Sequence, residues 1–91
     1  MFGRKKTKIT VQYDAGFQNA LYLRGEGLPG LNWDRGVPLK NVSADEWVFE
    51  TDASFNDGQF KILINDVVYE VGENHPLKKG SAISINPQFP S

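Results

Sequence analysis

Apolar and polar side chains alternate along several short stretches of this chain. A period of two places successive side chains on opposite faces and is typical of a half-buried β-strand. Some stretches alternate in this way, and others are short and rich in residues that favour β-strands. Together they are residues 9–13, 20–24, 37–39, 47–51, 59–65, 67–71 and 82–86. No stretch has a helical period. About seven short strands therefore predict an all-β fold, an antiparallel β-sandwich of immunoglobulin-like type, with a closed barrel as the alternative.

Turn residues separate the predicted strands. Asn65-Asp66 lies between the fifth and sixth strands, and this spacing predicts a two-residue hairpin turn. Residues 72–81 (GENHPLKKGS) predict a loop, and Pro87 and Pro90 discourage pairing after the last strand.

The longest predicted connection is a glycine-rich loop at residues 25–36 (GEGLPGLNWDRG). Its glycines and proline interrupt any helix or long strand. It nevertheless carries Leu28, Leu31 and Trp33. So many apolar side chains are unusual in a loop and need an explanation.

Composition narrows the classes of function. A chain of 91 residues fits one domain, and a net charge of -1 argues against a nucleic-acid partner. With no cysteine and one histidine, no metal site is expected, and nothing predicts a cofactor.

Residues 1–8 (MFGRKKTK) are basic and predict a solvated tail, with a single domain over residues 9–91. No apolar segment indicates a signal peptide or a membrane span, which predicts a cytoplasmic protein with no membrane partner.

Catalysis is not expected. Glycoside hydrolysis would need two carboxylates at a fixed separation in a cleft, and Asp34 and Glu70 are the only plausible pair. His75 lies in a predicted loop without a nucleophile and an orienting partner. We therefore predict that the chain is not an enzyme.

Binding is the better hypothesis because of the tryptophans. Trp47 lies in an alternating strand, which predicts a core position. Trp33 lies in the loop, which is equally compatible with a structural position and with a surface platform. A flat indole suits the apolar face of a sugar ring, since the hydroxyls stay free to bond. Lys61 and Asn74 could bond those hydroxyls, and Tyr69 could serve as a second platform.

The order of short motifs along the chain extends this hypothesis. The segment Leu21–Gly25 (LYLRG) leads into Gly30–Asp34 (GLNWD). It is followed by Pro38-Leu39, Trp47-Val48-Phe49, Gln59–Ile62 (QFKI) and Val68-Tyr69-Glu70, with Asn74 beyond. In this order the chain resembles the starch-binding domains of carbohydrate-binding module family 20 and the glycogen-binding domains of family 48. Families 25 and 26 share the implied fold and ligand.

The resemblance implies a β-sandwich that binds α-glucans such as starch, glycogen and maltooligosaccharides, alone or attached to a glucan-active enzyme. The implied site residues are Trp33, Lys61, Tyr69, Glu70 and Asn74. Tyr69 stands where the family usually has tryptophan, which implies a smaller platform and weaker binding. A second site is implied on Phe17, although its usual partner segment is shortened here. The alternative function is a protein-interaction or structural module that has lost sugar binding, because tryptophan and tyrosine are also typical of protein interfaces.

Overall fold

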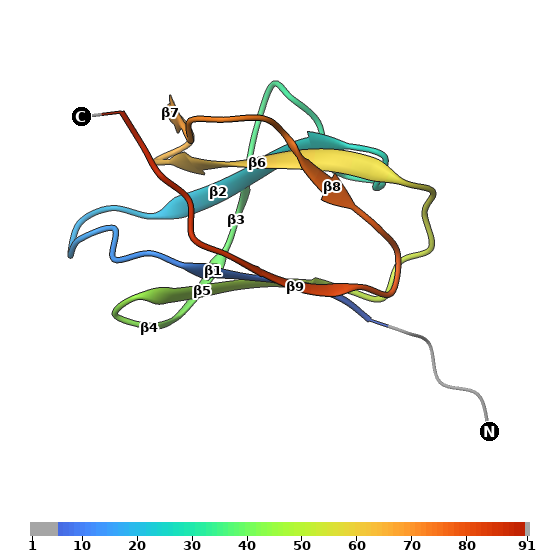
Figure 1. The fold of residues 1–91 in the computed structure, drawn as a ribbon, viewed down its shortest axis with the longest axis horizontal. Helices are drawn as coiled ribbons and strands as arrows, with labels where there is room; N and C mark the ends of the chain where they lie inside the picture. Colours follow the sequence, from blue (N-terminus) through green and yellow to red (C-terminus); the bar gives the residue numbers. More distant parts are fainter. Residues whose placement is uncertain (1–5, 91) are drawn as a thin grey trace.

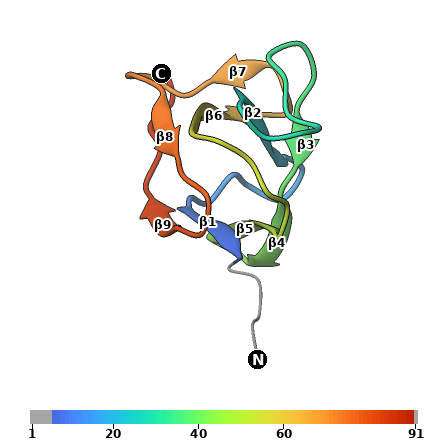
Figure 2. The ribbon, with the colours of Figure 1, turned by 90° about the vertical axis from the view of Figure 1, so that its right-hand side faces the viewer.

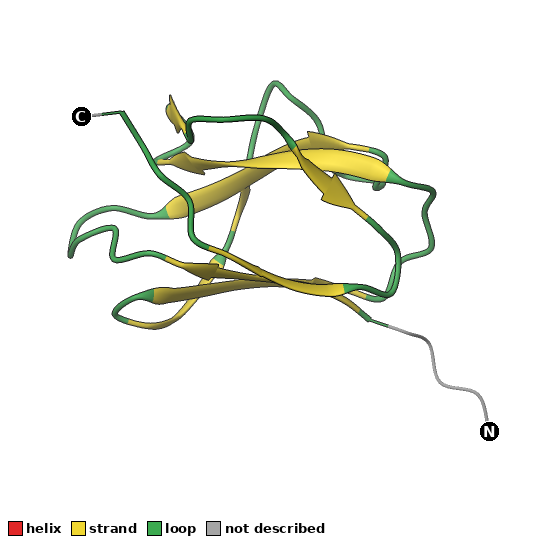
Figure 3. Cartoon of the chain, viewed as in Figure 1, coloured by secondary structure: helices red, strands yellow, loops and turns green. Residues whose placement is uncertain are grey.

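The computed structural model describes residues 6–90, whose β-strands form two sheets packed face to face (Figure 1 and Figure 2). These residues form strands and loops without any helix (Figure 3). Accordingly, that part of the chain has no helix of the length and apolarity needed to cross a membrane. The expected all-β sandwich is confirmed.

The first sheet has the strand order β4-β5-β1-β9. Its strands are β1 (Thr7–Gln12), β4 (Lys40–Ser43), β5 (Glu46–Thr51) and β9 (Ala82–Ile85). β1 pairs with β5 in antiparallel register but with β9 in parallel register, from Lys8↔Ala82 to Val11↔Ile85. This pair departs from the antiparallel expectation. Parallel neighbours need a crossover, and almost the whole domain lies between β1 and β9 along the chain.

The second sheet has the order β3-β2-β6-β7, and β8 also pairs with β6. Its strands are β2 (Leu21–Glu26), β3 (Val37–Pro38), β6 (Gly58–Ile64), β7 (Val68–Tyr69) and β8 (His75–Leu77). β2 pairs with β6 along nearly its full length, from Leu21↔Ile64 to Glu26↔Gln59. β7 and β8 therefore share the other edge of β6, β7 near its end and β8 near its start.

The core lies between the sheets and is filled by alternate residues of the long strands. Side chains with no exposed surface in this core are Ile9, Val11, Leu21, Leu23, Phe60, Ile62 and Leu77. The core position predicted for Trp47 is confirmed, since it is 6% exposed and its indole Nε1 donates to the Tyr13 carbonyl oxygen at 3.1 Å. The period of two thus correctly predicts the buried positions of Ile9 and Val11 in β1 and of Phe60 and Ile62 in β6. Leu63 is an exception, because it lies on the opposite side of β6 and is also fully buried.

The start of β1 and the presence of two additional strands differ from the sequence predictions. β1 begins at Thr7, so the last two residues of the predicted tail 1–8 belong to a strand, while residues 1–5 lie outside the described range. Thr7 is buried, and its Oγ1 accepts the Gly80 N–H at 2.8 Å. β4 and β8 were not predicted. Both are short and lack an apolar alternation, so pairing with β5 and β6 rather than local composition makes them strands.

The predicted hairpin between β6 and β7 is confirmed. Asn65 and Asp66 have φ angles of 54° and 58°, and the Val67 N–H donates to the Ile64 carbonyl oxygen at 3.0 Å. Positive φ at both central residues is the mark of a type I′ turn, which Asn and Asp tolerate better than most residues. The turn therefore places Asp66 at the end of the second sheet in a fixed orientation.

Candidate functional site

The loop between β2 and β3 is anchored to the core by leucines. Leu28 and Leu31 are 5% and 9% exposed and belong to the core cluster. Beyond them, the Asn32 side-chain oxygen accepts the backbone N–H groups of Asp34 and Arg35, each at 2.8 Å. This turn presents Trp33, which is partly exposed. The apolar loop thus has two roles, with leucines facing the core and the indole reaching the surface.

The face of the second sheet that points away from the core, called the outer face here, carries Lys61 and Tyr69 of the predicted site residues. The inward residues of β2 and β6 are Leu21, Leu23, Phe60 and Ile62, so the outer face takes the alternate positions. The outer-face residues are Tyr22, Arg24 and Glu26 on β2, Gln59, Lys61 and Leu63 on β6, and Tyr69 on β7. Arg24 lies directly opposite Lys61, and Leu63 lies opposite Tyr69. Lys61 and Tyr69 are therefore neighbours on one surface.

Arg24 connects the two aromatic platforms. One guanidinium nitrogen, Nη1, donates to the Trp33 carbonyl oxygen at 3.0 Å and to the Tyr69 hydroxyl at 3.1 Å. The Arg24 Cζ atom lies 5.6 Å from the centroid of the Tyr69 ring, within the range of a cation–π contact. The Trp33 loop and β7 are thus held together at the outer face by one side chain.

The same guanidinium is fixed from its other side by Asp66. Arg24 Nε donates to the Asp66 Oδ1 at 2.8 Å, and Nη2 donates to the Asp66 carbonyl oxygen at 3.0 Å. Asp66 Oδ2 accepts the Gly36 N–H at 3.1 Å. We call Arg24, Asp66 and Gly36 the Arg24 clasp. A guanidinium has five N–H groups, and these contacts use four of them, so Arg24 positions the platforms and has little capacity left for a ligand.

The clasp has electrostatic and steric consequences. The hydrogen bond from Arg24, together with that from the Gly36 N–H, holds the pKa of Asp66 below its usual value. Gly36 packs so tightly here that a Cβ atom would lie 2.9 Å from the Tyr22 Cβ and would collide with the Asp66 carboxylate. The approach of the loop to the sheet therefore requires glycine at position 36.

Lys61 lies in the middle of the outer face but is largely engaged. Its Nζ donates to the Glu70 carbonyl oxygen at 3.0 Å and to the Gly72 carbonyl oxygen. An ammonium group has three N–H donors, so one is left for a ligand hydroxyl. Lys61 therefore also fixes the segment that leads from β7 to β8.

Glu70 does not reach the outer face, in contrast to the role implied for it. It is 3% exposed, its Oε1 accepts the Ile62 N–H at 2.8 Å, and both its oxygens lie 2.9 Å from His75 Nε2. The reason is the period of two, since Tyr69 points outward and the next residue must point inward. Glu70 acts as an internal brace between β6 and the start of β8.

Asn74 belongs to a row of polar side chains beside Trp33. The Trp33 indole Nε1 donates to Glu26 Oε1 at 2.9 Å, and Glu26 is paired across the sheet with Gln59. Gln59 Oε1 in turn accepts a hydrogen bond from Asn74 Nδ2 at 3.0 Å. We call Glu26, Gln59 and Asn74 the polar row. Trp33, Lys61, Tyr69 and Asn74 thus gather around one region of the outer face.

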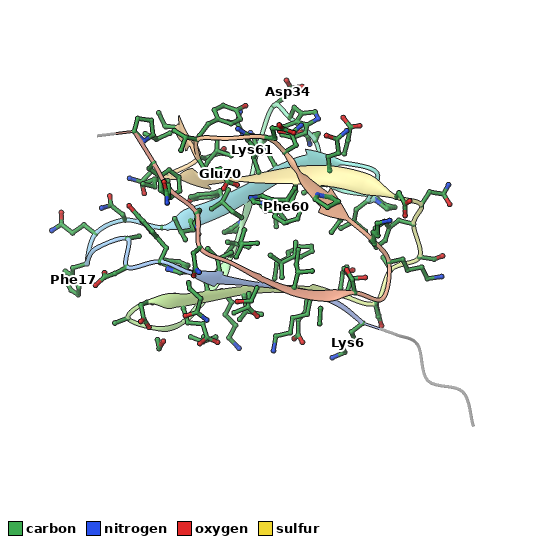
Figure 4. The ribbon with its side chains drawn as sticks, viewed as in Figure 1. Lys6, Phe17, Asp34, Phe60, Lys61 and Glu70 are labelled. Atoms are coloured by element: carbon green, nitrogen blue, oxygen red, sulfur yellow. The ribbon has the colours of Figure 1, made fainter. Side chains whose placement is uncertain are left out.

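Phe17 lies apart from this region. It is fully exposed, at 102% of its reference area, in the connection between β1 and β2. Figure 4 shows it at the end of the molecule, well away from Lys61 and Asp34. The structure therefore does not join Phe17 to the outer-face residues.

The residues considered for catalysis are also separated. Asp34 is exposed at the outer end of its loop, whereas Glu70 lies below Lys61 on the inner side of the sheet (Figure 4). Across residues 6–90, no group of three or more His, Asp or Glu side chains is placed to hold a metal ion.

Four residues of this site were not predicted: Arg24, Asp66, Glu26 and Gln59. Arg24 and Asp66 are 42 positions apart in the chain, and Glu26 and Gln59 meet only through the register of β2 with β6. The one local signal was the polar side of the alternation in β2 and β6. Comparisons with models of protein families, with curated proteins and with solved structures found no match to this chain.

Proposed function

We propose that this chain is a non-catalytic carbohydrate-binding module that binds α-glucans, such as starch, glycogen or maltooligosaccharides, on its outer face. It would then be a relative of carbohydrate-binding module families 20 and 48. One observation carries the proposal. The backbone carbonyl oxygen of Trp33 and the hydroxyl of Tyr69, which belong to different elements, both accept hydrogen bonds from a single guanidinium on the outer face.

The chemistry of a glucose ring fits this arrangement. The C–H face of a pyranose is apolar and covers the flat face of an indole or phenol, while its hydroxyls point outward around the ring. Lys61 retains one N–H donor, and Asn74 offers an amide at the rim of the surface. In this proposal the two platforms, which Arg24 connects, contact successive units of a curved glucan.

A site with two platforms and few polar contacts is expected to bind modestly. Dissociation constants between about 1 μM and 1 mM correspond to about -8 to -4 kcal/mol. A module of that affinity gains from attachment to, or association with, a glucan-active enzyme, because linkage raises the effective concentration of the site on a polymer. The proposed partner is thus the polysaccharide, with such an enzyme as a second associate. The cytoplasmic location stays a prediction.

The test is calorimetric titration of the protein with maltoheptaose, comparing the wild type with Trp33→Ala. Trp47, the other tryptophan, is buried and reports the fold of the variant by fluorescence. We expect saturable binding by the wild type and at least a tenfold loss in the variant, because the larger platform is removed. Binding by Trp33→Ala equal to the wild type would contradict the proposal.

A second function, docking of a partner protein, is favoured by a different observation. Val67, Val68, Tyr69 and Val71 are exposed by 72%, 38%, 41% and 50%, which makes β7 and its flanks an apolar strip. Such strips are frequent at protein interfaces. Absence of any maltoheptaose binding by a folded wild-type protein would put this second function first.

A further inference from the structure

The carboxylate of Glu26 lies at the edge of the proposed indole platform. Its Oε1 accepts the Trp33 Nε1–H at 2.9 Å, so the carboxylate is held beside the five-membered ring of the indole. Glu26 is exposed at the end of β2. Equatorial hydroxyls of a sugar stacked on the indole would point toward this edge, because they lie close to the mean plane of the pyranose.

The polar row retains unused hydrogen-bonding groups. Within residues 6–90, Trp33 is the side chain that donates to the Glu26 carboxylate, which leaves Oε2 as an acceptor. Gln59 uses its oxygen to accept from Asn74 and keeps its NH₂ group, while Asn74 keeps its oxygen. Along the row, Glu26 therefore offers an acceptor, Gln59 a donor and Asn74 an acceptor. Neighbouring hydroxyls of a sugar ring can bond to all three, because a hydroxyl can both donate and accept.

Among the charged groups near Trp33, the Glu26 carboxylate is the one bonded to the indole itself. The Arg24 guanidinium is paired with Asp66, and the Lys61 ammonium is bound to two backbone carbonyls. Arg35 and Asp34 follow Trp33 in the chain and contribute one charge of each sign. An anionic group brought to the indole edge would therefore meet a carboxylate at close range.

From this arrangement we infer that Glu26 is a specificity-determining residue of the site, which selects uncharged sugars and rejects sugars that carry carboxylate or phosphate groups. The inference rests on the proposed function, because it concerns the ligand stacked on Trp33. Hydrogen bonds from sugar hydroxyls to a carboxylate are charge-assisted and favour the neutral ligand. Like charges at the same place disfavour the anionic ligand.

The test compares two probes on each protein: maltoheptaose, and maltoheptaose whose primary hydroxyls have been oxidised to carboxylates. The measured quantity is the ratio of the two dissociation constants, obtained by calorimetry at low salt. Glu26→Gln is the variant, because the amide oxygen can still accept the indole N–H while the charge is lost. Asp34→Asn is the matched control, since it removes one negative charge next to Trp33 without touching the polar row.

We expect the wild type to bind the neutral probe about five- to tenfold more tightly than the oxidised one, as a screened interaction between exposed charges allows. Glu26→Gln should lower this ratio by about fivefold, and Asp34→Asn should change it less than about twofold, because screening weakens the more distant charge. The wild-type preference should also shrink as salt is added.

Different outcomes separate the inference from the proposed function. A ratio that is the same in Glu26→Gln and the wild type, while Trp33→Ala still loses maltoheptaose binding, would overturn the inference alone. Tighter binding of the oxidised probe by the wild type would also overturn the inference, since the positively charged side chains near Trp33 would then outweigh Glu26. Failure of the wild type to bind maltoheptaose at all would overturn both.

Discussion

The ion pair in the Arg24 clasp offers the sharpest test of how the site is held together. Asp66→Asn keeps the size of the side chain and its tolerance of positive φ, so the β6–β7 turn is retained. The substitution removes the negative charge of the carboxylate whose Oδ1 accepts the Arg24 Nε–H at 2.8 Å. The effect should therefore report the ion pair and the position of the Trp33 loop, and not the turn.

The expected loss in the free energy of unfolding follows from how exposed the Arg24–Asp66 ion pair is. Hydrogen bonds to charged groups contribute about 1.5–3 kcal/mol, but exposed ion pairs contribute less than about 1 kcal/mol. The side chains of Arg24 and Asp66 are 16% and 25% exposed, which lies between these limits. We expect Asp66→Asn to lower the free energy of unfolding by about 1 kcal/mol at pH 7, or about 4–8 °C in Tm.

The pH dependence gives an independent check with a defined sign. The pKa of Asp66 is lowered in the folded state by the Arg24 hydrogen bond, so the folded protein binds the proton less readily than the unfolded chain. The contribution of the pair is present above the usual aspartate pKa, about 3.9, and is lost as the pH falls through the lower folded value. The difference in Tm between wild type and Asp66→Asn should therefore shrink as the pH is lowered from about 5 toward 2.

Thermal unfolding followed by tryptophan fluorescence measures both effects. Asp52→Asn is the control, because it removes an exposed carboxylate that directly follows β5 in the other sheet. A Tm for Asp66→Asn equal to that of the wild type at pH 7 would refute the reasoning. So would a difference in Tm that stays constant down to pH 2, because it would not then arise from the ionised carboxylate.

Two further predictions concern Glu70 and Phe17, which the structure places away from the proposed sugar-binding surface. Glu70→Ala should lower the free energy of unfolding by about 2–4 kcal/mol in urea titrations, because it leaves the buried Ile62 N–H without its acceptor and His75 without its partner; a loss below about 0.5 kcal/mol would contradict the brace. Phe17→Ser should change stability by less than about 0.5 kcal/mol and leave maltoheptaose affinity at the Trp33 site within twofold, whereas loss of that affinity would place Phe17 in the same site.

The sequence singled out Trp33, Lys61, Tyr69 and Asn74 but not the residues that hold them together on the outer face. Trp33 could be singled out because it lies in a glycine-rich loop and not at an alternating strand position, and Lys61 because its ammonium group can donate to sugar hydroxyls. The outward position of Tyr69 and the inward position of Glu70 follow from a period of two, whereas the family resemblance implied a sugar-binding role for both. Glu26 could not be found in this way, since its place beside Trp33 depends on the conformation of the whole loop.

The sequence alone predicted the class of fold, the inward positions of Ile9 and Val11 in β1 and of Phe60 and Ile62 in β6, the core position of Trp47 and the β6–β7 turn. These features depend on a period of two and on the φ preferences of single residues, which are local properties. Only the tertiary structure decided the parallel pairing of β1 with β9, the existence of β4 and β8, and the clasp that joins Trp33 to Tyr69. Each of these depends on contacts between residues far apart in the chain, where register and sheet packing, not local pattern, set which side chains meet.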